Sequence, residues 1–323
     1  MAASNLAHLG VHKILEQFVN QCLERKFLLD PAVKEIEARK LRSLIEDHSR
    51  HLPSQSAFTE LMNHLTDSGY ELLAHPEAVY KLAGISVLDC LLDINEDLVP
   101  DRRIQIAGKL RNVFENDKLG IGESGILILR ICAHAIGHLA RIASTSEIEY
   151  LQDFYYPTAM RLVDTKYQKS STSIISTSTA ASSSSDFFKL SGCLILKQLA
   201  KNSHAIIYSK RKLVFASLWE VVCDKSAVVR DASASCLLAC FILVSQREKM
   251  EDWVDKALNQ VQSGFESNQA EKIIGSLLIL DIVIGGQLVP VRDIRCQRID
   301  LSMSIFRGML FYTAVVIFHT RKP

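Results

Sequence analysis

A glycine-rich segment at residues 120–125 offers the most familiar chemistry in this sequence of 323 residues. Gly120, Gly122 and Gly125 match the Gly-x-Gly-x-x-Gly pattern, in which the backbone amides of a tight turn hold the phosphates of a nucleotide. Such a turn must follow a β-strand, whereas residues 104–114 have the apolar spacing of an amphipathic helix. We therefore interpret the segment as a turn between two helices.

Two other pairs of residues have the spacing of one helix face. His134 and His138 stand four residues apart, as the zinc ligands of a zincin do, but a zincin needs Glu after the first His and here Ala135 follows. We expect two histidines packed in a helix or at its surface edge. Cys236 and Cys240 have the same spacing without another Cys or His nearby, so we expect them in the core.

Other catalytic signatures are missing from the sequence. Residues 186–188 read Asp-Phe-Phe rather than the Asp-Phe-Gly of protein kinases, and the chain contains neither His-Arg-Asp nor Gly-x-Ser-x-Gly. We predict that this chain has no catalytic residues, no metal site and no cofactor.

The composition narrows the class of protein. With 48% hydrophobic residues but 14 Gly and 7 Pro, a helical fold is favoured over a turn-rich β fold. A net charge of +1 gives no electrostatic reason to expect nucleic acid as a partner. Eight cysteines without a Cys-x-x-Cys pair favour a reducing compartment, and the apolar run at 309–318 is shorter than the ~20 residues that span a bilayer. These features predict a cytoplasmic protein that does not insert into membranes.

A helix of small and aliphatic residues recurs along the chain. It starts at Leu82, Ile131, Leu190, Ala232 and Ile273, and these starts are separated by 49, 59, 42 and 41 residues. HEAT and armadillo repeats, which are antiparallel helix pairs, have a period of about 40–47 residues. We therefore predict an all-α fold, an α-solenoid with a HEAT- or armadillo-like superhelix of about six pairs over residues 1–290.

Each recurring helix after the first follows a more amphipathic one, which would form the second layer of the stack. These amphipathic helices are expected at 101–116, 147–164, 206–223 and 251–265, and a weaker first pair is expected at 5–27 and 31–51. Two segments stand outside the pattern. Residues 168–186 are rich in Ser and Thr and are predicted to be a disordered insertion, and residues 291–323 form an atypical tail.

The clearest single repeat begins at Asp224. The residues from there to Ala232 have the Asp-x-x-x-x-Val-Arg-x-Ala layout of HEAT inner helices, with Asp224 capping a turn and Arg230 polar on the helix. In that fold, such Asp and Arg residues commonly form a ladder between adjacent repeats. We expect Asp224 and Arg230 to have this structural role rather than to contact a ligand.

The succession of repeats resembles the N-terminal HEAT region of the target of rapamycin (TOR) serine/threonine kinases. The most distinctive stretch ends a helix with Leu-x-x-Gln-Arg-Glu at residues 243–248. The other supporting stretches are 84–92, 109–112, 135–140, 147–150, 161–162, 205–219, 227–232, 240–242, 264–266 and 275–280.

This resemblance implies a very large cytosolic kinase whose N-terminal solenoid binds protein subunits in dimeric complexes of growth and nutrient signalling. It implies that the kinase domain lies far beyond residue 323, so that no catalytic residue carries over to this chain. The plainest interpretation of the tail at 291–323 is then a truncated gene model, with a short natural isoform as the alternative.

Two other functions remain open from the sequence. An unrelated HEAT or armadillo adaptor, such as a transport or phosphatase scaffold, would show the same periodicity, and a kinase domain encoded downstream in the parent transcript would exclude it. An enzyme that uses residues 120–125 would bind ATP or NAD.

Overall fold

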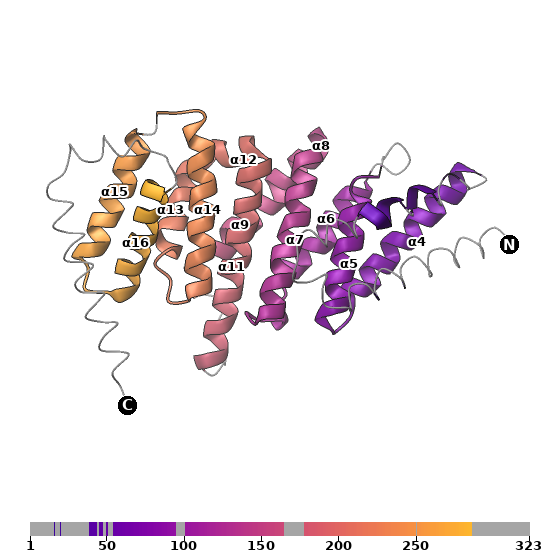
Figure 1. Ribbon diagram of the computed structural model, residues 1–323, viewed down its shortest axis with the longest axis horizontal. Helices are drawn as coiled ribbons and strands as arrows, with labels where there is room; N and C mark the ends of the chain where they lie inside the picture. Colours follow the sequence, from indigo (N-terminus) through magenta and orange to yellow (C-terminus); the bar gives the residue numbers. More distant parts are fainter. Residues whose placement is uncertain are drawn as a thin grey trace. The chain divides into compact units, whose positions relative to one another are not determined.

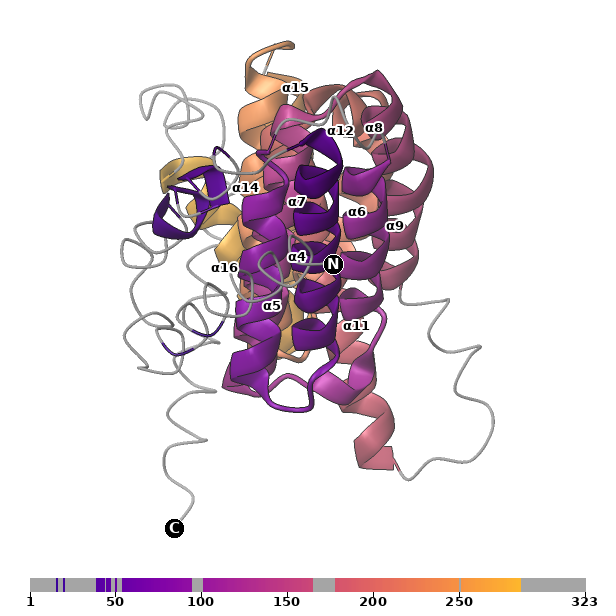
Figure 2. The same cartoon turned by 90° about the vertical axis from the view of Figure 1, so that its right-hand side faces the viewer.

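The computed structural model describes residues 54–94, 101–164, 178–249 and 251–285, together with a few isolated residues between 16 and 50. Every regular element in these ranges is helical. The helices lie side by side with nearly parallel axes within each of two compact units (Figures 1 and 2). Because short connections join consecutive helices, neighbours run antiparallel. The predicted all-α fold of antiparallel helix pairs is confirmed.

The first unit, Met1–Leu151, has two helix pairs among its described residues. Its elements are α4 (Gln55–Ala74), α5 (Ala78–Leu91), α6 (Arg102–Phe114), the 3₁₀ turn η1 (Asp117–Leu119), α7 (Glu123–Ile142) and α8 (Thr145–Tyr150). Helix α4 packs on α5 and α6 packs on α7, while α5 and α7 pack on each other. The small-residue helices α5 and α7 therefore form one layer, and α4 and α6 cover it.

The second unit, Gln152–Pro323, repeats this arrangement. Its elements are the π-helical turn η2 (Leu151–Tyr155), α9 (Tyr156–Val163), α11 (Ser178–Asn202), α12 (His204–Ser209), α13 (Arg211–Val221), α14 (Ala227–Ser245), α15 (Glu251–Glu266) and α16 (Ala270–Gly285). The layer of small-residue helices is α11, α14 and α16, and the pairs are α9 with α11, α13 with α14, and α15 with α16.

Local signals explain where several helices begin. The Ser54 hydroxyl accepts a hydrogen bond from the Ala57 N–H at 3.2 Å and so caps the first turn of α4. At the start of α8, the Glu147 carboxylate accepts a hydrogen bond from the Ser144 N–H and so caps the helix. Arg103 of α6 lies 3.5 Å from the same carboxylate. Since both side chains are almost fully buried, this ion pair ties α6 to α8.

Close helix crossings explain the small residues. A Cβ added to Gly84 of α5 would lie 2.7 Å from the backbone nitrogen of Leu73 and 2.8 Å from the carbonyl oxygen of Gly69, both on α4. No side chain fits there, so the two helix backbones approach closely only because Gly occupies this position. At this crossing, a small residue of α5 marks the contact between the two helices.

Two of the expected amphipathic helices are interrupted. The segment 147–164 divides into α8, the π turn η2 and α9, with Pro157 in the first turn of α9, where its missing N–H costs no helical hydrogen bond. The segment 206–223 divides into α12 and α13 at Lys210.

Two described helices, α7 and α14, are long and apolar enough to cross a membrane by length and composition alone. The most apolar windows of these helices are 61% and 50% buried inside the fold. A helix enclosed by its partner and by neighbouring pairs is apolar nearly all round, so a core helix of a helical stack passes the same test.

Several sequence predictions fall on residues outside the described ranges. They include most of the first helix pair at 5–51, the greater part of the Ser/Thr-rich segment and the tail at 291–323. The end of the Ser/Thr-rich segment is described, and residues 178–186 belong to helix α11.

Candidate functional site

The glycine segment forms a turn between helices, as its surroundings indicate. Gly120 ends η1 with φ of 66°, a left-handed conformation that favours glycine, and Gly122 is the N-cap of α7. A Cβ on Gly125 would lie 2.4 Å from the carbonyl oxygen of Gly120. Gly120 and Gly125 therefore serve the geometry of a tight helix–helix turn, and the element before the segment is helical.

His138 belongs to an acidic cluster rather than to a pair with His134. Its ring Nδ1 lies 2.8 Å from Asp89 Oδ1 and its Nε2 lies 2.9 Å from Asp93 Oδ1. The hydrogen bond to Asp89 raises the pKa of His138, burial opposes this, and the charges of both carboxylates add to the rise. Arg42 donates to the other oxygen of Asp93. The imidazolium thus ties α7 to the end of α5.

The cysteines of the described part are free thiols, and most are buried. Cys236 and Cys240 are fully buried on α14, as expected. Burial raises the pKa of the Cys193 thiol to about 12 and also raises the pKa of the Cys132 and Cys236 thiols. Because the thiolate is the nucleophilic form, these side chains act as small core residues.

Asp224 and Arg230 lie at the junction of two helix pairs. The Asp224 carboxylate accepts from Lys189 Nζ of α11 at 2.6 Å and from the Ser226 N–H at 2.9 Å. Arg230 donates to the backbone carbonyls of Asp224 (2.8 Å) and Lys225 (2.9 Å). The structure therefore brings the two residues together through the main chain, and Asp224 reaches the neighbouring pair through Lys189.

A second carboxylate faces this junction. Burial and the charge of Asp224 raise the pKa of Asp186 on α11, while Lys189 and a hydrogen bond from Ser226 oppose the rise. Lys189 thus interacts with two carboxylates, that of Asp186 on its own helix and that of Asp224 before α14. This arrangement holds α11 and the start of α14 together.

The Gln-Arg-Glu stretch at the end of α14 is the centre of another network. Glu248 accepts hydrogen bonds from the Tyr208 hydroxyl at 2.7 Å and from Trp253 Nε1 at 2.8 Å, and Arg211 lies 2.5 Å from its carboxylate. These hydrogen bonds, first that of Trp253, lower the pKa of Glu248. The guanidiniums of Arg211 and Arg247 lie over the Tyr208 ring. The network joins α12, α13, α14 and α15.

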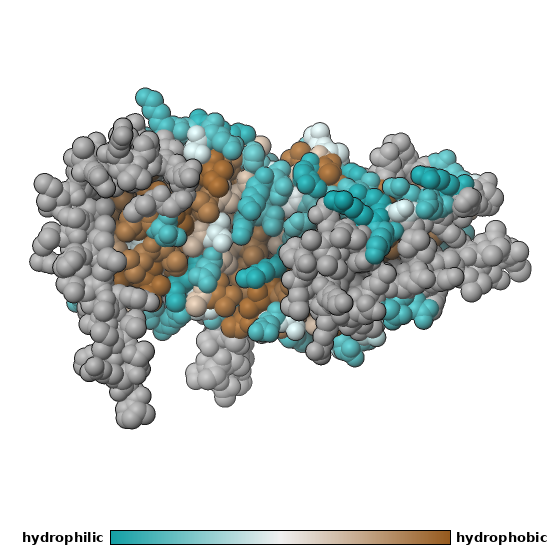
Figure 3. Space-filling view, viewed as in Figure 1, coloured by the Kyte–Doolittle hydropathy of each residue, from teal (hydrophilic) through white to brown (hydrophobic). Residues whose placement is uncertain are grey.

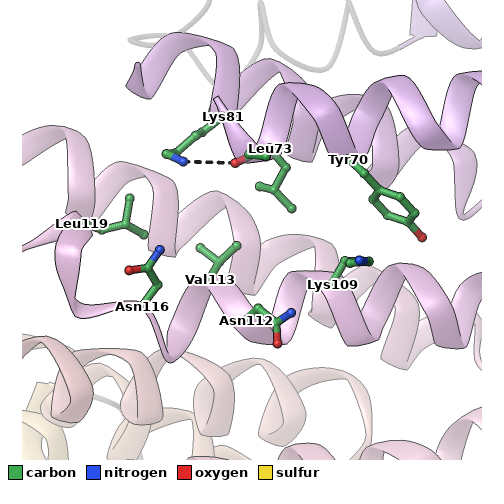
Figure 4. A pocket seen from close by; sticks show the side chains of 9 residues that line it. Tyr70, Leu73, Lys81, Lys109, Asn112, Val113, Asn116 and Leu119 are labelled. Atoms are coloured by element: carbon green, nitrogen blue, oxygen red, sulfur yellow. Dashed lines mark hydrogen bonds between the residues drawn. The ribbon is translucent and has the colours of Figure 1, made fainter. Parts of the chain in front are cut away.

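A groove in the first unit is lined by α4, α5, α6 and η1 and has a volume of about 260 Å³. We call it the α4–α6 groove. Figure 4 shows Lys81 at one end of the groove, with its Nζ bonded to the carbonyl oxygen of Leu73, and Lys109 at the other end near Tyr70. Its lining residues are Tyr70, Leu73, Ala74, Lys81, Lys109, Asn112, Val113, Asn116 and Leu119.

The second unit has a larger hollow of about 560 Å³ among α13, α15 and α16. Its lining mixes acidic, basic and amide side chains with Trp219 and Cys223. Burial raises the pKa of the Cys223 thiol, so the hollow holds no activated thiolate. Both hollows thus lie beside the amphipathic helices.

Apolar surface also lies on the small-residue layer of the second unit. Figure 3 shows it over α14 and α16. On α14, Ile242 is 45% exposed and Leu238 is half-buried. On the other layer of this unit, Leu213 of α13 is 61% exposed. Exposed aliphatic side chains of this kind are contact points for protein partners when they lie together on one surface.

Two features of the first unit were not predicted from the sequence. Helix α4 was not identified, although Ser54 is a capping residue and Leu61, Met62 and Leu65 have helical spacing. The sequence also gives no sign that Asp89, 49 positions away, is a partner of His138. Long-range pairs of this kind leave no local signal in the sequence.

Comparison with known proteins finds distant relatives. No protein-family model matches the chain. It is 20% identical over 260 residues to the serine/threonine-protein kinase TOR2 of Saccharomyces cerevisiae and 21% identical over 270 residues to the serine/threonine-protein kinase tor1 of Schizosaccharomyces pombe. The matches cover 79% and 83% of this chain but 10% of each relative. The predicted resemblance is confirmed, and the chain is a distant relative of TOR kinases that spans about a tenth of their length.

Proposed function

We propose that this chain is a non-catalytic scaffold that binds protein subunits, equivalent to the N-terminal helical segment of a TOR-type kinase in growth and nutrient signalling. The similarity to two TOR kinases along 79% and 83% of the chain carries the proposal. The observed fold supports it, because stacked helix pairs offer long continuous surfaces on which affinity comes from broad contact.

The chemistry of the described residues supports binding rather than catalysis. His138, Asp224 and Glu248 each hold two or more elements of the fold together. The thiols of the described cysteines are free, which suits a reducing compartment, and we propose a cytoplasmic location on this basis. The dimeric state of the parent complex is part of the same proposal.

The experiment is an affinity purification of the full chain from cells that contain TOR complexes, followed by quantitative mass spectrometry. We expect subunits of a TOR complex to be enriched over a purification with the tag alone. If the chain folds, by circular dichroism, and captures subunits of a transport or phosphatase complex instead, the proposal is wrong.

The enzyme interpretation of residues 120–125 is tested on the same purified chain. A nucleotide that bound the glycine turn would stabilise the folded state and raise the melting temperature. We expect no change in melting temperature with ATP or with NAD at millimolar concentration. A saturable rise would show that the chain binds nucleotide and that it is more than a scaffold.

A further inference from the structure

The α4–α6 groove concentrates positive charge in a nearly neutral chain. The sequence has 37 Lys and Arg residues against 36 Asp and Glu residues. The residues that line the groove include Lys81 and Lys109, and none of them is Asp or Glu. Since opposite charges elsewhere in the described part often pair with each other, a lining with two ammonium groups and no carboxylate sets this groove apart.

Lys81 is held in place at the groove. Its Nζ donates to the carbonyl oxygen of Leu73 at 3.1 Å, close to the C-terminus of α4, which fixes the ammonium group near the negative end of a helix dipole. Burial lowers the pKa of Lys81 because the charged form has lost part of its hydration. An ammonium has three donors, so two remain after the bond to Leu73, and a ligand anion would restore the lost solvation.

The opposite wall comes from one face of α6 and its continuation. Lys109, Asn112 and Val113 are spaced at i, i+3 and i+4, which places them on one side of α6, and Asn116 follows in the connection to η1. Lys109 Nζ lies 5.4 Å from the centre of the Tyr70 ring, and this cation–π contact stabilises the ammonium group at the wall of the groove. Asn116 Oδ1 accepts from the Lys118 N–H, which leaves its NH₂ group as a donor.

The size of the groove limits its ligand. A volume of about 260 Å³ is below the ~300–1,000 Å³ of sites that enclose a small molecule, but it accommodates side chains of an extended peptide. The half-buried Leu73 and the buried Val113 lie between the two lysines in Figure 4. The lining thus alternates positive, apolar and positive groups.

We propose that the α4–α6 groove binds an acidic segment of a partner protein, with its anionic side chains at Lys81 and Lys109 and an apolar side chain between them. The anions are carboxylates of Asp or Glu, because each faces a single ammonium group and no Arg lines the groove to hold the larger charge of a phosphate in two parallel hydrogen bonds. This inference rests on the proposed scaffold function and adds the chemistry of one docking site to it.

The test uses the full chain and fluorescein-labelled peptides, with binding measured by fluorescence anisotropy. The first peptide is Gly-Ser-Glu-Leu-Glu-Ser-Gly, the second has phosphoserine in place of each Glu, and the third has Gln in place of each Glu. The proposal predicts saturable binding of the first peptide, weaker binding of the second and no binding of the third.

Variants locate the site. We expect the double variant Lys81→Gln/Lys109→Gln to bind the acidic peptide about tenfold more weakly, since two partly exposed charge pairs together contribute about this much. Lys118→Gln, an exposed lysine of η1 outside the lining, changes the same charge in the same unit and should bind within about twofold of the parent chain. Thermal unfolding of each variant establishes that the fold is retained.

Two results would overturn the proposal. The first is that the parent chain does not bind the glutamate peptide saturably, or that it binds the phosphoserine peptide more tightly. The second is equal weakening by the double variant and by Lys118→Gln, which would show a general effect of charge. Either failure leaves the scaffold function standing, because capture of TOR-complex subunits does not depend on this groove alone.

Discussion

Two ionisable side chains, His138 and Glu248, link helices to one another. His138 and Glu248 both lie in stretches that carry the resemblance to TOR kinases, and in the structure each joins elements that are distant in sequence. Glu248 accepts from both an aromatic hydroxyl and an indole N–H, which a Gln side chain could not do with one carbonyl oxygen in the same geometry. At these two residues, the resemblance to TOR kinases therefore reflects contacts that hold the fold together.

His138 makes stability depend on pH in a stated direction. Its folded-state pKa is raised above the ordinary value of 6.5, so its stabilisation is complete below pH 6.5 and is lost as pH rises through the folded-state pKa. His138 faces Asp89 and Asp93 at the end of α5. Arg42 donates to Asp93, and the buried Cys132 thiol of α7 lies near Asp89.

We predict that the free energy of unfolding of the parent chain falls above pH 6.5 by about 1 kcal/mol more than that of His138→Gln, because the amide carries no titrating proton. Urea unfolding at several pH values measures this difference. Parallel pH profiles for the two proteins would show that the imidazolium contributes nothing to stability.

At the scale of helices, close packing rests on positions without a side chain. Gly84→Ala would place a methyl group against the backbone of α4, and we expect a loss of about 1–3 kcal/mol of stability as the two helices separate. Gly108→Ala in α6 is the matched control, because its nearest neighbour would be the Tyr150 hydroxyl at 3.5 Å, an ordinary contact.

The control should gain stability. Alanine has a higher helix propensity than glycine, so Gly108→Ala is expected to stabilise the chain by about 0.5–1 kcal/mol. Chemical denaturation of both variants gives the two changes with opposite signs. A similar loss in both would mean that the α4–α5 crossing is not the reason for glycine at position 84.

The sequence predicts which segments are helices better than it predicts where they end. Five small-residue helices are expected, and α5, α7, α11, α14 and α16 contain them. Periodicity detects such helices because burial on all sides demands apolar residues throughout. The breaks at η2 and at Lys210 escape it, since the apolar spacing continues across them and the interruption depends on packing.

The candidate docking surfaces are harder still to predict from the sequence. Lys81 and Lys109 stand in different helices, and nothing in the sequence indicates that they line one groove. The exposed Leu213 and Ile242 look like core residues of amphipathic and apolar helices until burial is known. A surface that binds a partner is defined by which residues the fold leaves uncovered, and this is a property of the tertiary structure.

For the whole molecule, the proposed function requires that the helical stack binds subunits of a TOR complex directly. The most direct test mixes the purified full chain with each purified subunit at micromolar concentration and measures molar mass by size-exclusion chromatography with light scattering. We expect a complex whose molar mass equals the mass of the chain plus the mass of at least one subunit. Elution of the chain apart from every subunit, with its fold intact by circular dichroism, would contradict it.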